Sequence, residues 1–352
     1  MKSLLWFSVA MLLALLGLTY MSFSFASARF QSDGQVELGE VDWLRDYDEA
    51  LAQSKTSGKP LFILFQEVPG CHNCQKFGKE VLSHRLIVDA IENEFVPLAI
   101  FNNKGGQDAA VLKHFREPSW NNPVVRIFDQ KERELTARMG NFHPQEVING
   151  MAEALETAGK PIPVYLDLLA QQTNARFGLT ETAVFSMYCF WSGELKLGQL
   201  EGVIETAPGF MNGREVVQLT YDQGKTNYDQ LVQSAKQVGA IDGAFYVNKS
   251  QESMAKNHFS GSSTKPTKEF VLDGAPKYYL SKTKLKYLPM LPLQRIEVNR
   301  AIYERRGYQQ YLSPGQLARL DQIEQSSKRL SDVSHSSDFM ADMKALDQQL
   351  NP

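Results

Sequence analysis

The chain has 352 residues, of which 43% are hydrophobic and 22% charged, a mixture typical of globular proteins with more than one domain. A formal net charge of -3 and a pI of about 6.1 provide no basic field that would attract nucleic acid, so we exclude that class of partner. Three cysteines are too few for a structural disulfide framework. We expect neither a bound metal nor an organic cofactor.

The N-terminal segment has the pattern of a secretory leader. Lys2 precedes an apolar run over residues 4–18, and the segment closes with Ala-Ser-Ala at 26–28, the small-x-small pattern of a cleavage site. We predict that residues 1–28 are a signal peptide. The alternative is an uncleaved membrane anchor, because the apolar stretch extends through Phe25 to about 22 residues. Both readings place the globular part outside the cytoplasm, in a periplasm or secreted.

Residues 35–159 alternate between helical and strand patterns around a CxxC pair, Cys71 and Cys74 in EVPGCHNC. Such a dithiol makes and breaks one disulfide quickly. A purely structural disulfide and a zinc site that includes His72 are the alternatives, although no second cluster supplies further zinc ligands. The expected elements are helices over 42–54, 75–93 and 144–158, and strands over 61–65, 95–101 and 124–129.

This first domain resembles the thioredoxin-like family, in DWLRDYDEALAQSKTSGKPLFILF before the dithiol and EFVPLAIF after it. In that family the first cysteine lies at a helix N-terminus, which favours the thiolate, and a cis proline packs against the dithiol. The resemblance implies that Cys71 is the attacking thiol, that Cys74 is the resolving thiol and that Pro123 is the cis proline. An ordinary trans turn proline is the alternative for Pro123.

The second half of the chain has the pattern of a split ferredoxin-like domain. Residues 160–180 form a linker, GKPIP, and a connecting helix over 164–177. We predict a βαββαβ domain over 181–300, followed by a helical tail over 301–352, so that the fold class is α/β followed by α+β. The expected strands are 183–188, 203–207, 215–222 and 244–247, and the expected helices are 190–200 and 227–238.

The third cysteine, Cys189, lies where the first strand of this second domain passes into its first helix. A sulfur at a helix N-terminus gains thiolate character and is suited to act as a nucleophile. Phe190 and Trp191 follow it, and two aromatic rings could form an apolar box for a methyl group; the alternative is that both belong to the core of the helix. Glu215 begins a strand that we expect to pair with the first strand, so its carboxyl group could approach the sulfur.

Together, CFWSGELKLGQLEGVIETAPGF, NGREVVQLTYDQGKTNYDQLV and AFYV resemble the A class of methionine sulfoxide reductases. The resemblance covers about 70 residues. It implies that the Cys189 thiolate attacks the sulfoxide sulfur, that Glu215 protonates the departing oxygen as a neutral acid, and that Phe190 and Trp191 hold the substrate methyl group. Methionine leaves and Cys189 becomes a sulfenic acid.

A sulfenic acid must be resolved by another thiol, and the second domain contains no further cysteine. We infer that Cys71 attacks Cys189 and that Cys74 releases the mixed disulfide. A short tether would make this step effectively first-order. Outside the cytoplasm the dithiol then needs an exported thiol carrier or a membrane electron donor, in addition to oxidised methionine in peptides or proteins as the substrate.

The sequence also departs from the reductase pattern. Tyr188 replaces the glycine before the cysteine, and the segment with the substrate-binding aspartate is missing, so Asp242 is the candidate replacement. The tyrosines that bind the oxygen are not assigned; Tyr278, Tyr279 and Tyr287 are candidates, with surface packing as the alternative. Two other functions therefore remain: a thiol-disulfide oxidoreductase whose C-terminal domain only binds clients, and a binding module without turnover.

Overall fold

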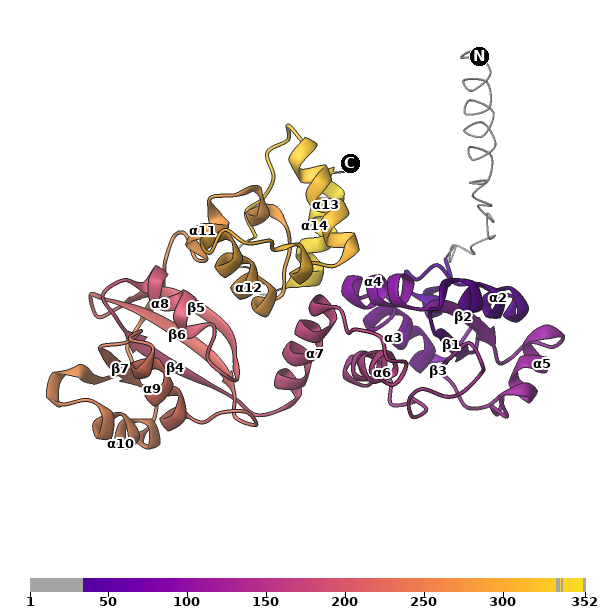
Figure 1. Ribbon diagram of the computed structural model, residues 1–352, viewed down its shortest axis with the longest axis horizontal. Helices are drawn as coiled ribbons and strands as arrows, with labels where there is room; N and C mark the ends of the chain where they lie inside the picture. Colours follow the sequence, from indigo (N-terminus) through magenta and orange to yellow (C-terminus); the bar gives the residue numbers. More distant parts are fainter. Residues whose placement is uncertain (1–33, 334–335, 337, 351–352) are drawn as a thin grey trace, which may run out of the picture.

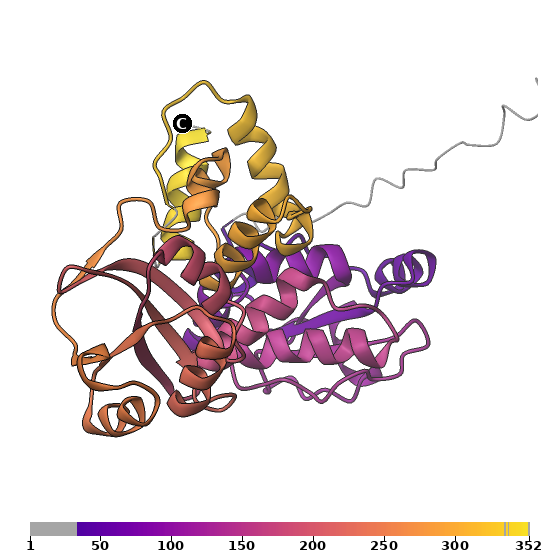
Figure 2. The same cartoon turned by 60° about the vertical axis from the view of Figure 1, so that its left-hand side comes forward.

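The computed structural model describes residues 34–333, 336 and 338–350, so the predicted leader or anchor at residues 1–28 lies outside the described residues. Figures 1 and 2 show three packed parts: a first domain, a domain built on a larger sheet, and a unit of helices that lies beside both. None of the helices in the described part of the chain is long and apolar enough to cross a bilayer.

The first domain is built around a three-stranded sheet in the order β2-β1-β3. The central strand β1 (Leu61–Gln66) is parallel to β2 (Val96–Phe101) and antiparallel to β3 (Val124–Phe128). All six residues of β1 are buried, because helices cover both faces of the sheet. These helices, with one short 3-10 turn, are η1 (Val36–Leu38), α2 (Tyr47–Ser57), α3 (His72–Glu80), α4 (Arg85–Glu94), α5 (Gln107–His114) and α6 (Pro144–Thr157).

One predicted helix in this domain, over 75–93, is wrong because two helices occupy the segment. Helix α3 ends at Glu80, and the Ser83 hydroxyl donates to the Gly78 carbonyl, which takes up one of the acceptors left at the end of the helix. Helix α4 then begins after His84. Because of this break, α3 carries the CxxC pair while α4 packs against β2, α7 and α13.

The second sheet has six strands in the order β8-β7-β4-β6-β5-β9. Its four central strands are all antiparallel and, with helices α8 and α9, give the expected βαββαβ order with the ferredoxin-like strand arrangement. The short strands β8 and β9 add one edge each. The bounds are β4 (Thr180–Ser186), α8 (Phe190–Leu197), β5 (Val203–Met211), β6 (Arg214–Asp222), α9 (Tyr228–Gln237), β7 (Gly243–Tyr246), α10 (Lys249–His258), η2 (Gly261–Ser263), β8 (Thr264–Pro266) and β9 (Phe270–Leu272).

The helical unit comprises the described residues of 278–350. Its helices share one apolar core, and the expected boundary at residue 300 falls inside α12. Phe339 and Met343 belong instead to the core of the first domain, so the unit also packs on that domain. Its elements are α11 (Tyr278–Ser281), η3 (Lys284–Tyr287), α12 (Pro292–Tyr303), η4 (Gln309–Tyr311), α13 (Pro314–Gln325) and α14 (Phe339–Leu350).

Helix α7 (Val164–Phe177) lies between the first domain and the other two parts (Figure 1). Leu166 and Leu169 are buried in the core of the first domain, whereas Leu168 and Ala175 are buried in the core of the helical unit. The helix is therefore packed on two sides, and it joins the domains as part of both cores.

Candidate functional site

The dithiol lies at the start of α3, with Cys71 exposed as the N-cap residue and Cys74 buried. The two sulfur atoms are 3.4 Å apart, and the Cys74 thiol donates to the Asn122 side-chain oxygen at 2.8 Å. The Asn122–Pro123 peptide bond is cis, as is the Val68–Pro69 bond in the loop before the dithiol. The fold therefore presents one accessible sulfur and keeps the other behind it.

The two thiols differ in acidity. Burial raises the pKa of Cys71, but hydrogen bonds from the Cys74 amide and thiol and from the Asn73 amide outweigh it, so the net pKa lies below the ordinary value. Burial and the neighbouring Cys71 raise the pKa of Cys74 to about 12. Since the thiolate is the nucleophile, the lower pKa favours Cys71 as the attacking sulfur.

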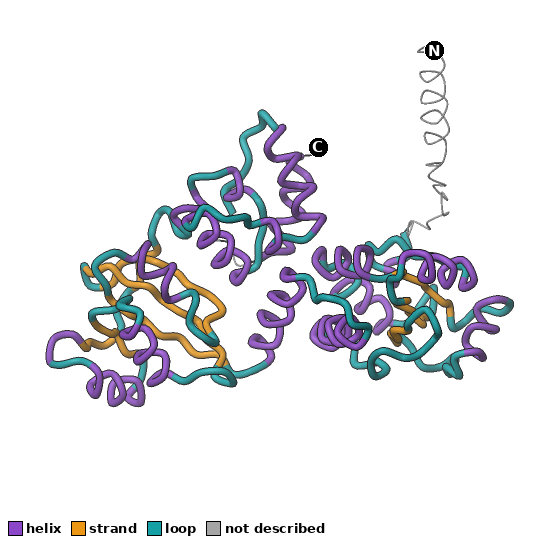
Figure 3. The backbone as a smooth tube through the Cα atoms, viewed as in Figure 1, coloured by secondary structure: helices purple, strands orange, loops and turns teal. Residues whose placement is uncertain are grey.

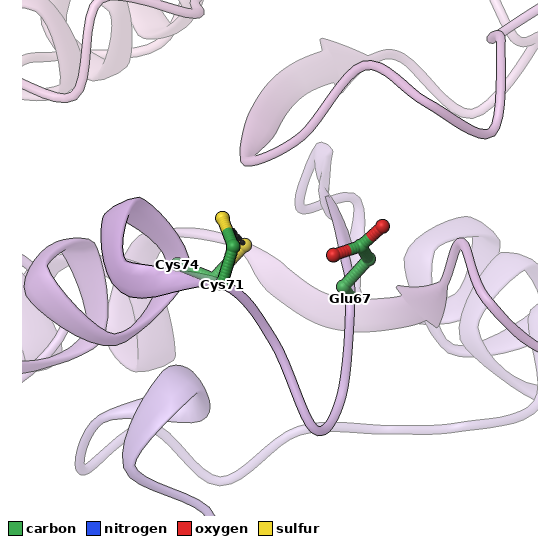
Figure 4. A group of neighbouring side chains, drawn as sticks. All are labelled: Glu67, Cys71 and Cys74. Carbon is green, nitrogen blue, oxygen red and sulfur yellow. Dashed lines mark hydrogen bonds between the residues drawn. The ribbon is translucent and has the colours of Figure 1, made fainter.

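Glu67 follows β1 directly, and Figure 4 shows its carboxylate beside the two sulfurs. One carboxylate oxygen and both sulfur atoms lie within 4.8 Å of one another. The zinc alternative placed His72 with the cysteines, whereas the third donor in this group is Glu67. Two sulfurs and one carboxylate could hold a soft cation with one open position. Glu67 also opposes ionisation of Cys71, because its negative charge raises the pKa of that thiol.

Cys189 is the N-cap residue of α8 and is partly exposed. The backbone N–H of Phe190 donates to the Glu215 carboxylate at 2.8 Å, so β6 brings this carboxylate beside the residue that follows the cysteine. A cleft of about 180 Å³ opens next to the sulfur. Its lining consists of Met187, Tyr188, Cys189, Ser192, Gly193, Lys196, Gly239 and Ala240.

The aromatic rings after Cys189 are packed by other parts of the chain. Phe190 is buried and contacts Phe210 edge to face, with ring centroids 5.2 Å apart. Trp191 is stacked by Tyr278 at 3.9 Å, and its Nε1–H donates to Asp273 at 3.1 Å. One indole face is thus covered by Tyr278, and neither Phe190 nor Trp191 lines the cleft beside Cys189.

The other candidate residues fall in different places. The pKa of Tyr279 is raised by burial, by Tyr303 and, to a smaller degree, by Cys189. Tyr287 packs against the core of the helical unit instead. Asp242 accepts from the Ser186 hydroxyl at 2.7 Å and pairs with Arg214 at 2.6 Å, next to the strand ends that lead to Cys189 and Glu215.

The structure gathers the candidate residues into two separate groups. Cys71, Cys74 and Pro123 lie in the first domain, and Cys189 and Glu215 lie in the second, with α7 between the two domains in Figures 1 and 3. Sequence reasoning missed Glu67, Asn122, Phe210 and Asp273. Glu67 follows a strand and Asn122 precedes Pro123, and both positions are only weak indications of a functional residue. No sequence spacing indicated a role for Phe210 or Asp273.

A family model matches part of the first domain, and two solved structures are similar to about a third of the chain. Residues 42–130 match the family model described as thioredoxin-like. A structural comparison finds a DsbH oxidoreductase, with 20% identity and a TM-score of 0.30 over 34% of this chain and 88% of that chain. A thioredoxin from Thermus thermophilus also has 20% identity and a TM-score of 0.30, over 34% of this chain and 90% of its own.

Sequence comparison finds proteins named peptide methionine sulfoxide reductase MsrA. One from Methanococcus maripaludis strain C7 is 38% identical over 71 residues, 15% of this chain and 45% of its own. One from Enterobacter sp. strain 638 is 33% identical over 116 residues, 27% and 53% of the two chains. One from Escherichia coli O157:H7 is 34% identical over 103 residues, 23% and 48%. The chain spans about half the length of the curated relatives it matches.

Proposed function

We propose, from a thioredoxin-like region joined to a region similar to the reductases named MsrA, that this chain reduces methionine S-sulfoxide in peptides or proteins. We place the reaction outside the cytoplasm, because of the leader pattern at residues 1–28. The observation that carries the proposal is the arrangement at α8, where Cys189 caps the helix and the Glu215 carboxylate reaches the next backbone amide at 2.8 Å.

In the first step the Cys189 thiolate attacks the sulfoxide sulfur. The sulfur–oxygen bond of the substrate breaks, the oxygen ends on Cys189 as a sulfenic acid, and the sulfoxide sulfur is reduced by two electrons to the thioether. Glu215, as a neutral acid, gives a proton to the departing oxygen, and we take the Tyr279 hydroxyl as the candidate second donor. Phe190, Trp191 and Tyr278 form the walls that hold the methyl group.

In the second step the dithiol regenerates Cys189. The Cys71 thiolate attacks the sulfenic sulfur, water leaves, and a Cys71–Cys189 disulfide forms; Cys74 then attacks Cys71 and releases the Cys189 thiol. The net result is methionine, water and a Cys71–Cys74 disulfide. An exported thiol carrier or a membrane electron donor must return two electrons to that disulfide.

This step requires movement, because the two sites lie in different domains. The sheet domain is joined to α7 at Gly178, and Lys277 fastens it to the helical unit, so we propose that these two parts move as one body relative to the first domain. Attack by the dithiol of a second chain is the alternative route. Within one chain, the connection between the first domain and the sheet domain gives roughly millimolar effective thiol concentrations when its length matches the distance between the two sites.

The test is turnover of methionine S-sulfoxide by single-cysteine variants. We expect Cys189→Ser to abolish reduction, because Cys189 is the cysteine that directly precedes the backbone amide bound by Glu215. Cys71→Ser should give one turnover and leave Cys189 as a sulfenic acid, which dimedone labels. Absence of dimedone labelling at Cys189 in reacted Cys71→Ser protein would refute resolution by Cys71, and reduction by Cys189→Ser would refute the proposed nucleophile.

A second function is favoured by one observation, the stacking of Tyr278 on Trp191, which narrows the box before any substrate arrives. A thiol-disulfide oxidoreductase would need only the first domain, with Trp120 exposed close to the cis proline as a client contact. This function predicts reduction of insulin disulfides together with no consumption of any methionine sulfoxide.

A further inference from the structure

Lys277 is a buried cation at the join between the sheet domain and the helical unit. Its Nζ lies 2.5 Å from a Glu194 carboxylate oxygen, 2.6 Å from the Thr206 carbonyl oxygen and 3.0 Å from the Thr206 hydroxyl. Only 4% of Lys277 and 2% of Glu194 is exposed. The pair therefore connects the start of the helical unit to α8, the helix that Cys189 caps.

This pair is a poor way to gain stability. Burial lowers the pKa of Lys277, and the Glu194 carboxylate opposes that shift. The second oxygen of Glu194 has no hydrogen-bond partner among the described atoms, and Lys277 has a positive φ of 56°, which side-chain-bearing residues rarely adopt. The cost of desolvating a buried ion pair often exceeds the attraction between its charges. We therefore look for a role of this pair in positioning neighbouring residues.

The pair joins the two segments that carry Trp191 and Tyr278. Lys277 directly precedes Tyr278 and Tyr279, and Glu194 lies one helical turn after Trp191 on α8. Tyr278 stacks on Trp191 at 3.9 Å, so the ion pair and the ring stack clamp the same two segments together. The helical unit also holds Tyr279, because the Tyr279 N–H donates to the Asn299 side-chain oxygen of α12 at 3.1 Å.

We propose that the buried Lys277–Glu194 pair is a positioning device, which holds Tyr278 on Trp191 and Tyr279 near Cys189 so that the helical unit completes the sulfoxide site. The inference rests on the proposed function for its kinetic consequence, but its structural consequence does not need activity. Neither Lys277 nor Glu194 lines the cleft beside Cys189, so we infer that the pair acts through the tyrosines.

The kinetic test replaces the whole pair, because removing one partner would leave a buried charge alone and risk unfolding. We expect the double variant Lys277→Met/Glu194→Leu to melt within a few degrees of the parent and to lose kcat by at least about tenfold, as misplaced catalytic groups do. The assay uses free methionine S-sulfoxide with dithiothreitol as the reductant, which makes it independent of the first domain.

A thermodynamic cycle separates positioning from a merely structural effect. If the pair acts through Tyr279, the change Tyr279→Phe should lower kcat in the parent but have little further effect in the double variant. Costs that simply add, or an unchanged kcat in the double variant, would overturn the proposal. Arg319→Met is the matched control: it breaks the 2.7 Å ion pair with Asp347 in the same unit and should leave kcat unchanged.

A fluorescence measurement tests the same inference without catalysis. In a protein with Trp6→Phe and Trp120→Phe, the remaining indoles are Trp191 and the fully buried Trp43. We expect acrylamide to quench Trp191 about twice as efficiently in the Lys277→Met/Glu194→Leu variant, since Tyr278 no longer covers the indole, and no change in Arg319→Met. Unchanged quenching in the pair variant would overturn the inference even if the protein reduced no sulfoxide, whereas increased quenching in an inactive protein would count against the proposed function alone.

Discussion

Cys71 and Cys189 are both N-cap residues of short helices that follow buried strands. The sequence predicted these positions, because an apolar strand pattern ended shortly before each cysteine and a helical pattern began after it. It did not predict the contacts of Asn122 and Glu67 with the dithiol or of Asp273 with Trp191. Asn122 and Glu67 reach the dithiol from loops whose path depends on the tertiary fold, and Asp273 meets Trp191 across 82 positions of the sequence.

Glu67→Gln tests how the first dithiol is tuned. The Glu67 charge raises the pKa of Cys71, so its removal should lower that pKa and shift the midpoint of alkylation by iodoacetamide toward lower pH. Below the midpoint the variant should react a few-fold faster. The control is Glu80→Gln, which removes an exposed carboxylate from α3, the helix that Cys71 caps. A midpoint that moved to higher pH would contradict the role given to Glu67.

At the scale of elements, helix α3 depends on a close backbone contact. A Cβ placed on Gly78 would lie 2.0 Å from the Val36 carbonyl oxygen, because η1 crosses the helix at this glycine. The same η1 turn carries Glu37, whose carboxylate accepts the Gly70 N–H at 2.8 Å in the loop before Cys71. The support of the dithiol loop is therefore a segment more than 30 residues earlier, which periodicity alone did not indicate.

Gly78→Ala should consequently destabilise the first domain by about 1–3 kcal/mol, the usual range for overpacking. We also expect faster alkylation of Cys74, since displacement of η1 frees the loop that covers it. Thermal unfolding and mass-resolved alkylation measure the two effects. Gly105→Ala is the control, because no heavy atom lies within 4 Å of its added Cβ. Equal melting temperatures for the two variants would contradict the contact.

The order of the elements was predictable for the βαββαβ core of the second domain, whereas the packing of the parts on one another was not. Alternating apolar residues and turn signals gave βαββαβ for the second domain, but strands β8 and β9 have only three residues each and leave no periodic pattern. The sequence also predicted a helical tail over 301–352. Nothing in Phe339 or Met343 indicated that they would enter the core of the first domain.

The contact between α4 and α13 offers a pH test of that packing. Asp89 lies against Ser313, and burial raises its pKa despite Ser313 and Arg319. A carboxyl whose folded-state pKa is raised binds its proton more tightly when folded, so the protein loses stability as the pH rises through that pKa. Asp89→Asn does not titrate and should raise the melting temperature by a few degrees at pH 7.

The same substitution should lose its advantage as the pH falls below the folded-state pKa of Asp89, because the parent carboxyl is then also neutral. Melting curves at several pH values measure the difference, with Asp321→Asn on the exposed face of α13 as the control. A gain that grew toward acid pH would show that the charged form of Asp89 stabilises the interface.

The central claim is that electrons pass from the Cys71–Cys74 dithiol to Cys189, across two domains that the structure holds apart. The most direct measurement is mass spectrometry of proteolysed Cys74→Ser protein after reaction with methionine S-sulfoxide, with Cys74→Ser/Cys189→Ser as the control. The account predicts a peptide pair linked by a Cys71–Cys189 disulfide in the first protein and none in the second. A stable sulfenic acid on Cys189 beside a free Cys71 thiol would contradict it.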